Sequence, residues 1–237
     1  MLFNLQVALL LILLTWLFIY LSEKRNVFKQ WGMPFKQRCK QFIAGFIAIG
    51  GLSLLSQAFF TFMFEIHWTI SEYATFGKLL HSSALDFISV LIEELVFRGV
   101  LLYFLMKYVG SIKALAISAV AFGIYHWFTF NVLGNAVGMA LVFISTGFIG
   151  YAFAVAFVKT KSVILPIALH FGCNWVNNSL FSNGPNGTGL FIPHRFAPED
   201  TSFYIVSFIW YLLVPLLILL FLKSGALRNF ALQSKCS

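Results

Sequence analysis

Three ionisable side chains stand close together in the middle of a long apolar stretch of this chain. Glu93, Glu94 and Arg98 lie within the run from about residue 84 to residue 106, where the other residues are mostly apolar. A charge near the centre of a bilayer costs roughly 2.5–3.5 kcal/mol on insertion scales, so such a group needs a partner or a task. We therefore interpret this cluster as part of a functional site.

The spacing of these residues divides them into a pair and a single carboxylate. Glu94 and Arg98 are four residues apart, which places them on one face of a helix and lets them pair. Glu93 is rotated about 100° from Glu94, so we expect it to face groups on other helices.

Two histidines and an asparagine in other apolar stretches are the candidates for contact with Glu93. His126 follows Phe122 by four residues in one stretch, and Asn174 follows His170 by four residues in another. With a rise of about 1.5 Å per residue, all four polar residues fall in the middle third of a hydrocarbon core about 30 Å thick. We expect them to converge.

A carboxylate, two imidazoles and a carboxamide at this depth can hydrolyse an amide bond in two ways. In the first, Glu93 acts as a general base on water, while the imidazoles and Asn174 stabilise the oxyanion. In the second, Glu93, His126 and His170 hold a divalent metal such as zinc and leave one coordination position open. Asn174 is a poor zinc ligand but a good oxyanion donor, which favours the first.

Other interpretations of the same residues stay open. A histidine in a membrane helix commonly serves as a hydrogen-bond partner between helices, which would make the chain a non-catalytic scaffold. Glu93 and His126 can also form the relay of a proton-coupled transporter. The chain has no inverted repeat of the kind that many transporters carry.

Membrane helices must position these residues, because the composition excludes an ordinary soluble domain. Of the 237 residues, 60% are hydrophobic and only 10% are charged, whereas soluble domains are about 25% charged. We predict an all-α fold, a polytopic bundle of about seven to eight transmembrane helices that forms one membrane domain over residues 1–237. Apolar stretches close to the ~20 residues of a membrane span occur at 3–22, 42–64, 84–106, 112–130, 135–158, 162–180 and 203–222.

The positions of the basic residues predict an orientation. The formal net charge of +8 could suggest nucleic acid, but six of the 16 Lys and Arg lie between Lys24 and Lys40, directly after the first stretch. With seven spans and this loop inside, 13 basic residues lie inside and two outside, as the positive-inside rule requires. We therefore predict an integral membrane protein, without a nucleic-acid partner, whose N-terminus is outside and whose C-terminus is cytoplasmic.

Two segments do not fit the spans. Residues 65–83 are predicted to form an interfacial helix or to extend the third span. Residues 181–202 are rich in glycine and proline, which predicts a long outer loop. Such a loop is either a lid or binding loop or a plain connector.

The polar motifs together resemble those of the CPBP family, which comprises CAAX proteases and bacteriocin-processing intramembrane endopeptidases and is also called the Abi family. The motifs follow the family order on three spans, over about residues 80–180, with no departure at a motif position. They are Glu-Glu-x-x-x-Arg at Glu93, Glu94 and Arg98, Phe-x-x-x-His at Phe122 and His126, and His-x-x-x-Asn at His170 and Asn174.

The resemblance implies an intramembrane endopeptidase that acts on a membrane-associated peptide or protein in the lipid bilayer. By position, Glu93 would activate water and His126 would assist it. His170 and Asn174 would stabilise the oxyanion. The residues that would order the site are Glu94, Arg98 and Phe122.

The resemblance leaves the mechanism and the substrate open. The family is often labelled metalloprotease, with zinc as the expected metal here, and a glutamate-activated water is also proposed for it. Some members trim prenylated CaaX proteins, and others are linked to bacteriocin maturation or self-immunity. This short chain resembles the bacterial members, which implies the bacterial cytoplasmic membrane and a peptide substrate in preference to a prenylated protein.

Overall fold

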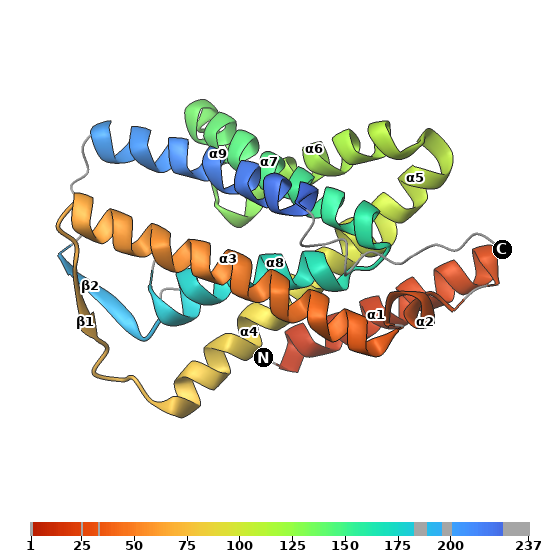
Figure 1. Ribbon diagram of the computed structural model, residues 1–237, viewed down its shortest axis with the longest axis horizontal. Helices are drawn as coiled ribbons and strands as arrows, with labels where there is room; N and C mark the ends of the chain where they lie inside the picture. The colour runs from red at the N-terminus through yellow and green to blue at the C-terminus, as the bar shows by residue number, and fades with distance from the viewer. Residues whose placement is uncertain (1, 25, 33, 183–188, 196–200, 225–237) are drawn as a thin grey trace.

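The computed structural model describes residues 2–24, 26–32, 34–182, 189–195 and 201–224. Figure 1 shows long helices stacked alongside one another, with two short strands at one end of the molecule. The π-helical segments η1 (Leu95–Leu102) and η2 (Trp175–Leu180) continue α4 and α8, and the strands are β1 (His67–Ile70) and β2 (Phe191–Arg195). The α-helices are α1 (Leu2–Glu23), α2 (Val27–Gly32), α3 (Phe35–Met63), α4 (Phe76–Glu94), α5 (Tyr103–Val109), α6 (Ser111–Thr129), α7 (Ala136–Thr160), α8 (Ile164–Asn174) and α9 (Thr201–Lys223).

Every predicted span falls on helical structure. Four of the described helices, α3, α6, α7 and α9, are each long and apolar enough to cross a membrane. Two other predicted spans change from α-helix to π-helix along their length. Residues 84–106 are shared by α4, η1 and α5, and residues 162–180 by α8 and η2. The prediction of a helical membrane bundle is confirmed, and the count of seven to eight spans stays a prediction.

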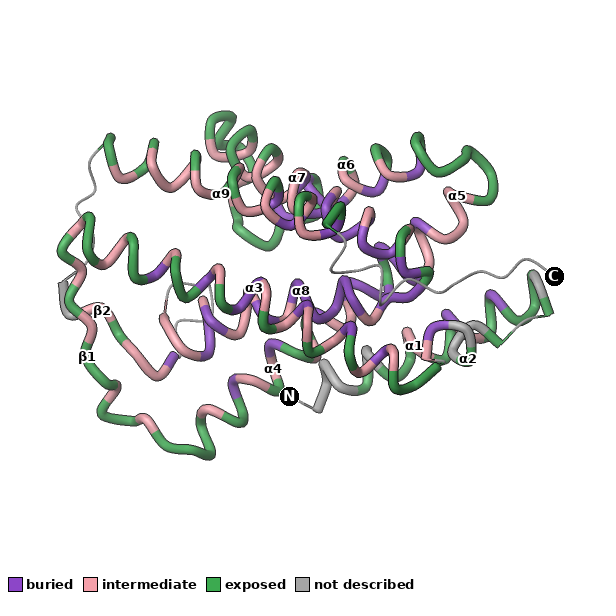
Figure 2. Tube along the Cα trace, viewed as in Figure 1, coloured by how far each residue is buried: buried purple, intermediate pink, exposed green. Residues whose placement is uncertain are grey.

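The helices turn large apolar side chains outward and several polar ones inward. Ile47, Phe62 and Ile112 are highly exposed, whereas Gln41 and Asp86 are buried. Figure 2 shows the buried residues gathered along α8 and the adjoining parts of its neighbours. This distribution suits a bundle whose outer surface contacts lipid and whose polar groups must find partners inside.

Small residues let the helices that carry the motif histidines pack closely. A β-carbon at Gly172 of α8 would lie 2.7 Å from Cγ2 of Ile49 and 2.8 Å from the carbonyl oxygen of Phe46, both in α3. A β-carbon at Gly123 of α6 would lie 2.8 Å from the ring of Phe143 in α7. Each of these glycines is within three residues of a motif histidine, so the close contacts help to fix the depth of the site.

Polar caps and a glycine set several helix ends. Thr75 caps α4 by accepting a hydrogen bond of 3.2 Å from the backbone N–H of Lys78. Asn135 caps α7 in the same way, accepting from the N–H of Gly138 at 3.0 Å. Such caps satisfy backbone donors that have no partner within the helix. Gly110, with φ of 78°, separates α5 from α6, a conformation that other residues rarely adopt.

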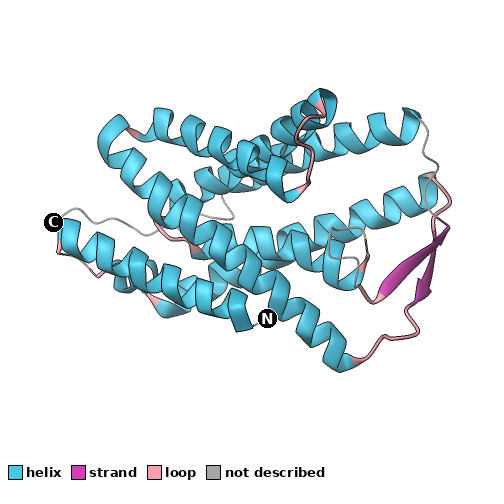
Figure 3. Ribbon diagram, turned by 180° about the vertical axis from the view of Figure 1, so that it is seen from behind, coloured by secondary structure: helices cyan, strands magenta, loops and turns pink. Residues whose placement is uncertain are grey.

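A two-stranded antiparallel sheet lies at one end of the bundle, and the sequence did not predict it. β1 pairs with β2, with Trp68 opposite Pro193 and Ile70 opposite Phe191. Figure 3 shows both strands at one end of the molecule. The prediction of an all-α bundle is confirmed, and the strand pair is a small addition that was not predicted because strands of four and five residues are too short to reveal an alternating pattern.

The strand pairing also tests the predicted loops. Residues 65–83 contain β1 and the start of α4, so this segment extends the third span and forms no separate interfacial helix. Within the predicted outer loop 181–202, residues 183–188 and 196–200 lie outside the described residues, as do C-terminal residues 225–237. Because β1 and β2 are paired, the two loops lie at the same end of the bundle. This agrees with the prediction of four spans between them, since an even number of spans returns the chain to the same side of the membrane.

Candidate active site

Two π-helical segments begin directly after motif residues. α4 ends at Glu94 and continues as η1, and α8 ends at Asn174 and continues as η2. π-helical turns are rare and are frequently found at functional sites. Two of the three helices that supply the predicted site, α4 and α8, therefore depart from regular α-helical geometry at the site itself, whereas α6, which carries His126, does not.

Glu94 and Arg98 form the buried ion pair that their spacing predicts. Nη1 of Arg98 lies 2.9 Å from Oε1 of Glu94, and both side chains are fully buried. Nη2 of Arg98 donates a second hydrogen bond, of 2.8 Å, to the carbonyl oxygen of Gly150 in α7. A buried charge is stable only when it is paired and hydrogen-bonded, and these contacts tie the helix of Glu94 to α7.

Aromatic rings enclose the Arg98 guanidinium group. Its central carbon lies 4.3 Å from the ring centre of Phe122 and 5.5 Å from that of Phe153, within the range of cation–π attraction. The ring of Phe122 is confined by α7, because a β-carbon at Gly150 would lie only 2.7 Å from its Cδ1 atom. These contacts support the ordering role predicted for Phe122.

The same oxygen of Glu94 also binds a histidine, which the sequence did not predict. Nδ1 of His170 lies 2.9 Å from Oε1 of Glu94, and the imidazole is stacked on the ring of Phe153 with 5.1 Å between ring centres. Because the carboxylate oxygen accepts, Nδ1 carries the proton, and Nε2 is the nitrogen left to face a substrate. Glu94 is therefore more than the partner of Arg98, since it also orients His170.

Glu93 faces His126 across a short gap, as its rotation away from Glu94 predicts. Oε2 of Glu93 lies 3.9 Å from Nε2 of His126, and this oxygen has no hydrogen-bond partner among the described residues. Nδ1 of His126 lies 2.8 Å from the carbonyl oxygen of Phe122, one turn earlier in α6. A carbonyl oxygen can only accept, so Nδ1 carries the proton, and neutral His126 presents an unprotonated Nε2 to Glu93.

Oε2 of Glu93 and Nε2 of His126 both accept hydrogen bonds, so a molecule with two donor hydrogens, such as water, can bridge them. A water oxygen about 2.8 Å from each atom can donate one hydrogen to Glu93 and the other to His126. Oε2 of Glu93 is itself buried, and the exposed parts of the two side chains, 10% of His126 and 9% of Glu93, lie next to it. The geometry suits the binding and activation of water.

Asn174 lies one turn beyond His170 and is half-buried. Their four-residue spacing places both side chains on one face of α8, but no hydrogen bond joins Asn174 to another motif residue. The structure thus brings together six motif side chains and places Asn174 beside them without a direct link. Those six are Glu93, Glu94, Arg98, Phe122, His126 and His170.

The predicted metal ligands do not form a zinc site as they are arranged. Among the residues that the structure describes, no three His, Cys, Asp or Glu side chains are grouped to hold one metal ion. Tetrahedral zinc brings its ligand atoms to within roughly 3.5 Å of one another, whereas the facing atoms of Glu93 and His126 are 3.9 Å apart. The set Glu93, His126 and His170 would have to contract around an ion.

Sequence reasoning missed two residues of α7 that complete the surroundings of the site. Gly150 accepts a hydrogen bond from Arg98, and Phe153 stacks on His170. α7 has no His, Asp, Glu, Lys or Arg within five residues of these positions, so charged motifs could not reveal its contribution. A weaker signal is the spacing of Gly147 and Gly150, one turn apart, which is typical of close helix packing.

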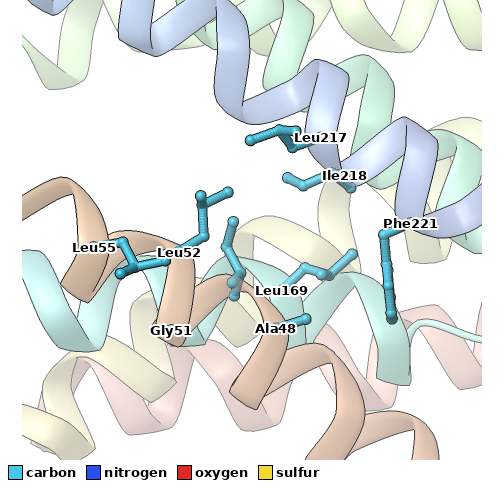
Figure 4. A pocket seen from close by; sticks show the side chains of 9 residues that line it. Ala48, Gly51, Leu52, Leu55, Leu169, Leu217, Ile218 and Phe221 are labelled. Carbon is cyan, nitrogen blue, oxygen red and sulfur yellow. The ribbon is translucent and has the colours of Figure 1, made fainter.

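A separate pocket of about 430 Å³ lies between α3, α8 and α9, and Figure 4 shows the side chains that line it. The lining consists of apolar residues and glycine and includes no motif residue. Leu169, the residue that α8 contributes, directly precedes His170. This lining suits a hydrocarbon chain and offers no group for hydrolysis.

Comparison with known proteins agrees with the motifs. A family model described as Type II CAAX prenyl endopeptidase Rce1-like matches residues 75–176, the segment that holds every motif residue. This segment of the chain is similar to the CAAX protease (CPBP) family, which supports the resemblance that the motifs carry. No curated protein and no solved structure matches the chain. The family match supports a CAAX-type intramembrane endopeptidase in general terms, and the long apolar helices of the chain support an integral membrane protein.

Proposed function

We propose that this CAAX-type protease hydrolyses a peptide bond of a membrane-associated peptide or protein with a water molecule that Glu93 activates. The observation that carries the proposal is the facing pair of Oε2 of Glu93 and Nε2 of His126, 3.9 Å apart. The carboxylate oxygen has no protein partner among the described residues, so it is available to take a proton from water.

The first step forms a bond between the water oxygen and the carbonyl carbon of the substrate. Glu93 removes one proton from the water, while His126 accepts a hydrogen bond from the other and orients the attack. The electron pair of the carbonyl double bond moves to its oxygen and gives a tetrahedral oxyanion. Holding the water between two fixed acceptors removes much of the entropic cost of this step.

The second step breaks the bond between carbon and nitrogen. Asn174 donates from its carboxamide to the oxyanion, and His170 donates from Nε2 when it is doubly protonated. As the oxyanion collapses, the proton held by Glu93 passes to the leaving amine. Glu94 maintains the orientation of His170 throughout, because its Oε1 accepts from Nδ1 at 2.9 Å.

The location of the site supports the proposed substrate class. The reacting groups are enclosed by apolar helices, so the scissile bond must lie within the bilayer or be drawn into it. We propose a membrane peptide or protein of the bacterial cytoplasmic membrane, with the basic segment 24–40, which contains α2 and the start of α3, facing the cytoplasm. The family description names prenyl endopeptidases, and the proposed substrate need not carry a prenyl group.

The test is a cleavage assay with the purified protein in liposomes that contain a library of membrane-anchored peptides, with products identified by mass spectrometry. Glu93→Gln and His126→Ala are each expected to lower the cleavage rate by about 10²- to 10⁴-fold, the usual contribution of acid–base groups. Matched controls are Glu72→Gln and His81→Ala, since both side chains are exposed; they should cleave at the unmodified rate.

Two outcomes would contradict the proposal. Cleavage that persists in Glu93→Gln and His126→Ala at the rate of the control variants would remove these residues from the reaction. Proton-driven solute flux in the same liposomes, lost in both variants and accompanied by no cleavage, would identify a relay in a transporter.

A further inference from the structure

A third buried carboxylate lies outside the site described above. Asp86 in α4 is 2% exposed, and both of its side-chain oxygens accept hydrogen bonds from η2. Nδ2 of Asn178 lies 2.9 Å from Oδ1, and the hydroxyl of Ser179 lies 2.6 Å from Oδ2. Because a buried carboxylate is costly unless it is fully bonded, its retention in an apolar bundle calls for a function.

Two further hydrogen bonds join the same pair of elements. The hydroxyl oxygens of Ser82 and Ser179 lie 2.8 Å apart, and the indole N–H of Trp175 donates to the hydroxyl of Ser83 at 2.8 Å. Together with the bonds to Asp86, these contacts form a polar clamp between α4 and η2. It has no part in the proposed chemistry, because both oxygens of Asp86 already have protein donors.

The clamp and the active site lie on one interface between antiparallel helices. Glu94 bonds to His170, and Asp86 bonds to Asn178. The two contacts are eight residues apart along α4 and also eight residues apart along the continuous helix of α8 and η2. Eight residues span about 12 Å of an α-helix. Asn174 lies midway between His170 and Asn178, so it is held at both sides by contacts to the helix that carries Glu93.

We propose that Asp86 is a positioning residue that sets the depth and rotation of Asn174 relative to Glu93, acting through Asn178 and Ser179. This inference rests on the proposed function, because Asn174 matters there as an oxyanion donor. An error of about 1 Å in such a donor can lower a catalytic rate by as much as about 100-fold. Asp86 therefore acts on the rate of the bound substrate and not on substrate binding.

A second polar contact to η2 supplies a matched control. Nε2 of Gln57 in α3 donates to Oδ1 of Asn177 at 2.8 Å, and Nδ2 of Asn177 donates to the carbonyl oxygen of Cys173 at 2.8 Å. Like the clamp, this contact ties η2 to a neighbouring helix, although it is only partly buried and joins neutral groups. It leads to α3, however, which carries no motif residue, so its loss should affect stability without moving Asn174 relative to Glu93.

The first experiment compares kcat and KM per folded molecule in liposomes. Asp86→Ala is expected to lower kcat by about 10- to 100-fold with little change in KM, and Gln57→Leu is expected to leave both nearly unchanged. The exchange variant Asp86→Asn with Asn178→Asp keeps the hydrogen-bonded pair and should restore kcat. A kcat for Asp86→Ala equal to that of Gln57→Leu, or no recovery in the exchange variant, would overturn the proposal.

The second experiment replaces the clamp with a reversible covalent bond. Because the hydroxyls of Ser82 and Ser179 are 2.8 Å apart, Ser82→Cys with Ser179→Cys places two thiols near disulfide distance. In a background where Cys39, Cys173 and Cys236 are Ser, oxidation of this pair should rescue kcat in Asp86→Ala, and reduction should remove the rescue. Because the oxidised and reduced forms are the same variant, comparing them also controls for its folding.

The rate of disulfide formation gives a readout that does not depend on cleavage. The Asp86→Ala variant should form the 82–179 disulfide several-fold more slowly than the parent pair, because α4 and η2 are no longer held in register. A lack of cleavage by every variant, the unmodified protein included, would refute the proposed function while the disulfide rates still report on the clamp. Equal disulfide rates with and without Asp86, or no rescue on oxidation, would refute the positioning role itself.

Discussion

His170 and Glu94 are joined by a hydrogen bond of 2.9 Å between Nδ1 of the imidazole and Oε1 of the carboxylate. The same oxygen accepts from Arg98 at 2.9 Å. One fully buried carboxylate therefore holds both the arginine that anchors its own helix and a histidine from another helix. Loss of this charge should affect the stability of the bundle and the geometry of the site together.

The first prediction concerns Glu94→Gln. A neutral amide leaves the buried guanidinium group of Arg98 without a counter-charge, and breaking a buried ion pair typically destabilises a protein by about 3–5 kcal/mol. We expect a markedly lower midpoint of thermal unfolding in detergent and loss of cleavage. The control is Glu72→Gln at an exposed position, which should change the free energy of unfolding by less than about 0.5 kcal/mol. Equal midpoints for the two variants would contradict this assignment.

The second prediction concerns Arg98→Lys, which keeps the charge and removes the planar fork. Arg98 donates to Glu94 and to the carbonyl oxygen of Gly150 through separate nitrogens, and a lysine ammonium cannot reproduce that geometry. An acceptor left without a donor costs about 1–3 kcal/mol, so we expect unfolding at lower temperature or denaturant concentration. The reverse exchange Lys113→Arg, at an exposed residue, should be neutral. Unchanged stability of Arg98→Lys would show that the bond to Gly150 contributes little.

The third prediction concerns the close contact between α7 and Phe122. In Gly150→Ala the new β-carbon would lie 2.7 Å from Cδ1 of Phe122, and overpacking of this kind costs about 1–3 kcal/mol. Since the Phe122 carbonyl holds His126, cleavage should fall together with stability. The control is Gly51→Ala, where nothing lies within 4 Å of the new carbon; there we expect equal or greater stability. A Gly150→Ala variant as stable and active as Gly51→Ala would contradict the packing argument.

Local spacing made part of this site predictable, and contacts between helices made the rest unpredictable. The pairing of Glu94 with Arg98 follows from the period of one helix, and the facing of Glu93 and His126 follows from rotation and depth. The bond from Glu94 to His170 depends instead on the register between α4 and α8. Packing sets that register, including the close approach of α3 to Gly172, and no single stretch of sequence encodes it.

The same distinction between local sequence patterns and contacts between distant segments applies to the fold. Long apolar runs predict helices because the helix is the structure that satisfies the backbone of a single spanning segment. The two-stranded sheet joins His67–Ile70 to Phe191–Arg195, which lie more than 100 residues apart. Neither segment is long enough to display a strand pattern, so their pairing could be known only from the three-dimensional structure.

The fourth prediction concerns metal removal. With Glu93 and His126 acting directly on water, cleavage should persist after exhaustive dialysis against a chelator, and added zinc should not increase it. The measurement is the cleavage rate before and after dialysis, with the metal content of the same samples determined by mass spectrometry. Activity that disappears with the metal and returns in proportion to added zinc would favour the alternative in which Glu93, His126 and His170 close around an ion.

The fifth prediction concerns orientation in the membrane. The excess of basic residues between Lys24 and Lys40 predicts that this segment faces the cytoplasm, while the segment after β1 faces the opposite side. Single cysteines introduced by Lys29→Cys and Glu72→Cys, both at exposed positions, in a background without native cysteines, report the two sides. A membrane-impermeant maleimide added to intact cells should label the Glu72→Cys variant and should label Lys29→Cys only after the membrane is permeabilised. Labelling of Lys29→Cys in intact cells, with protection of Glu72→Cys, would reverse the orientation and place the paired strands at the cytoplasmic end.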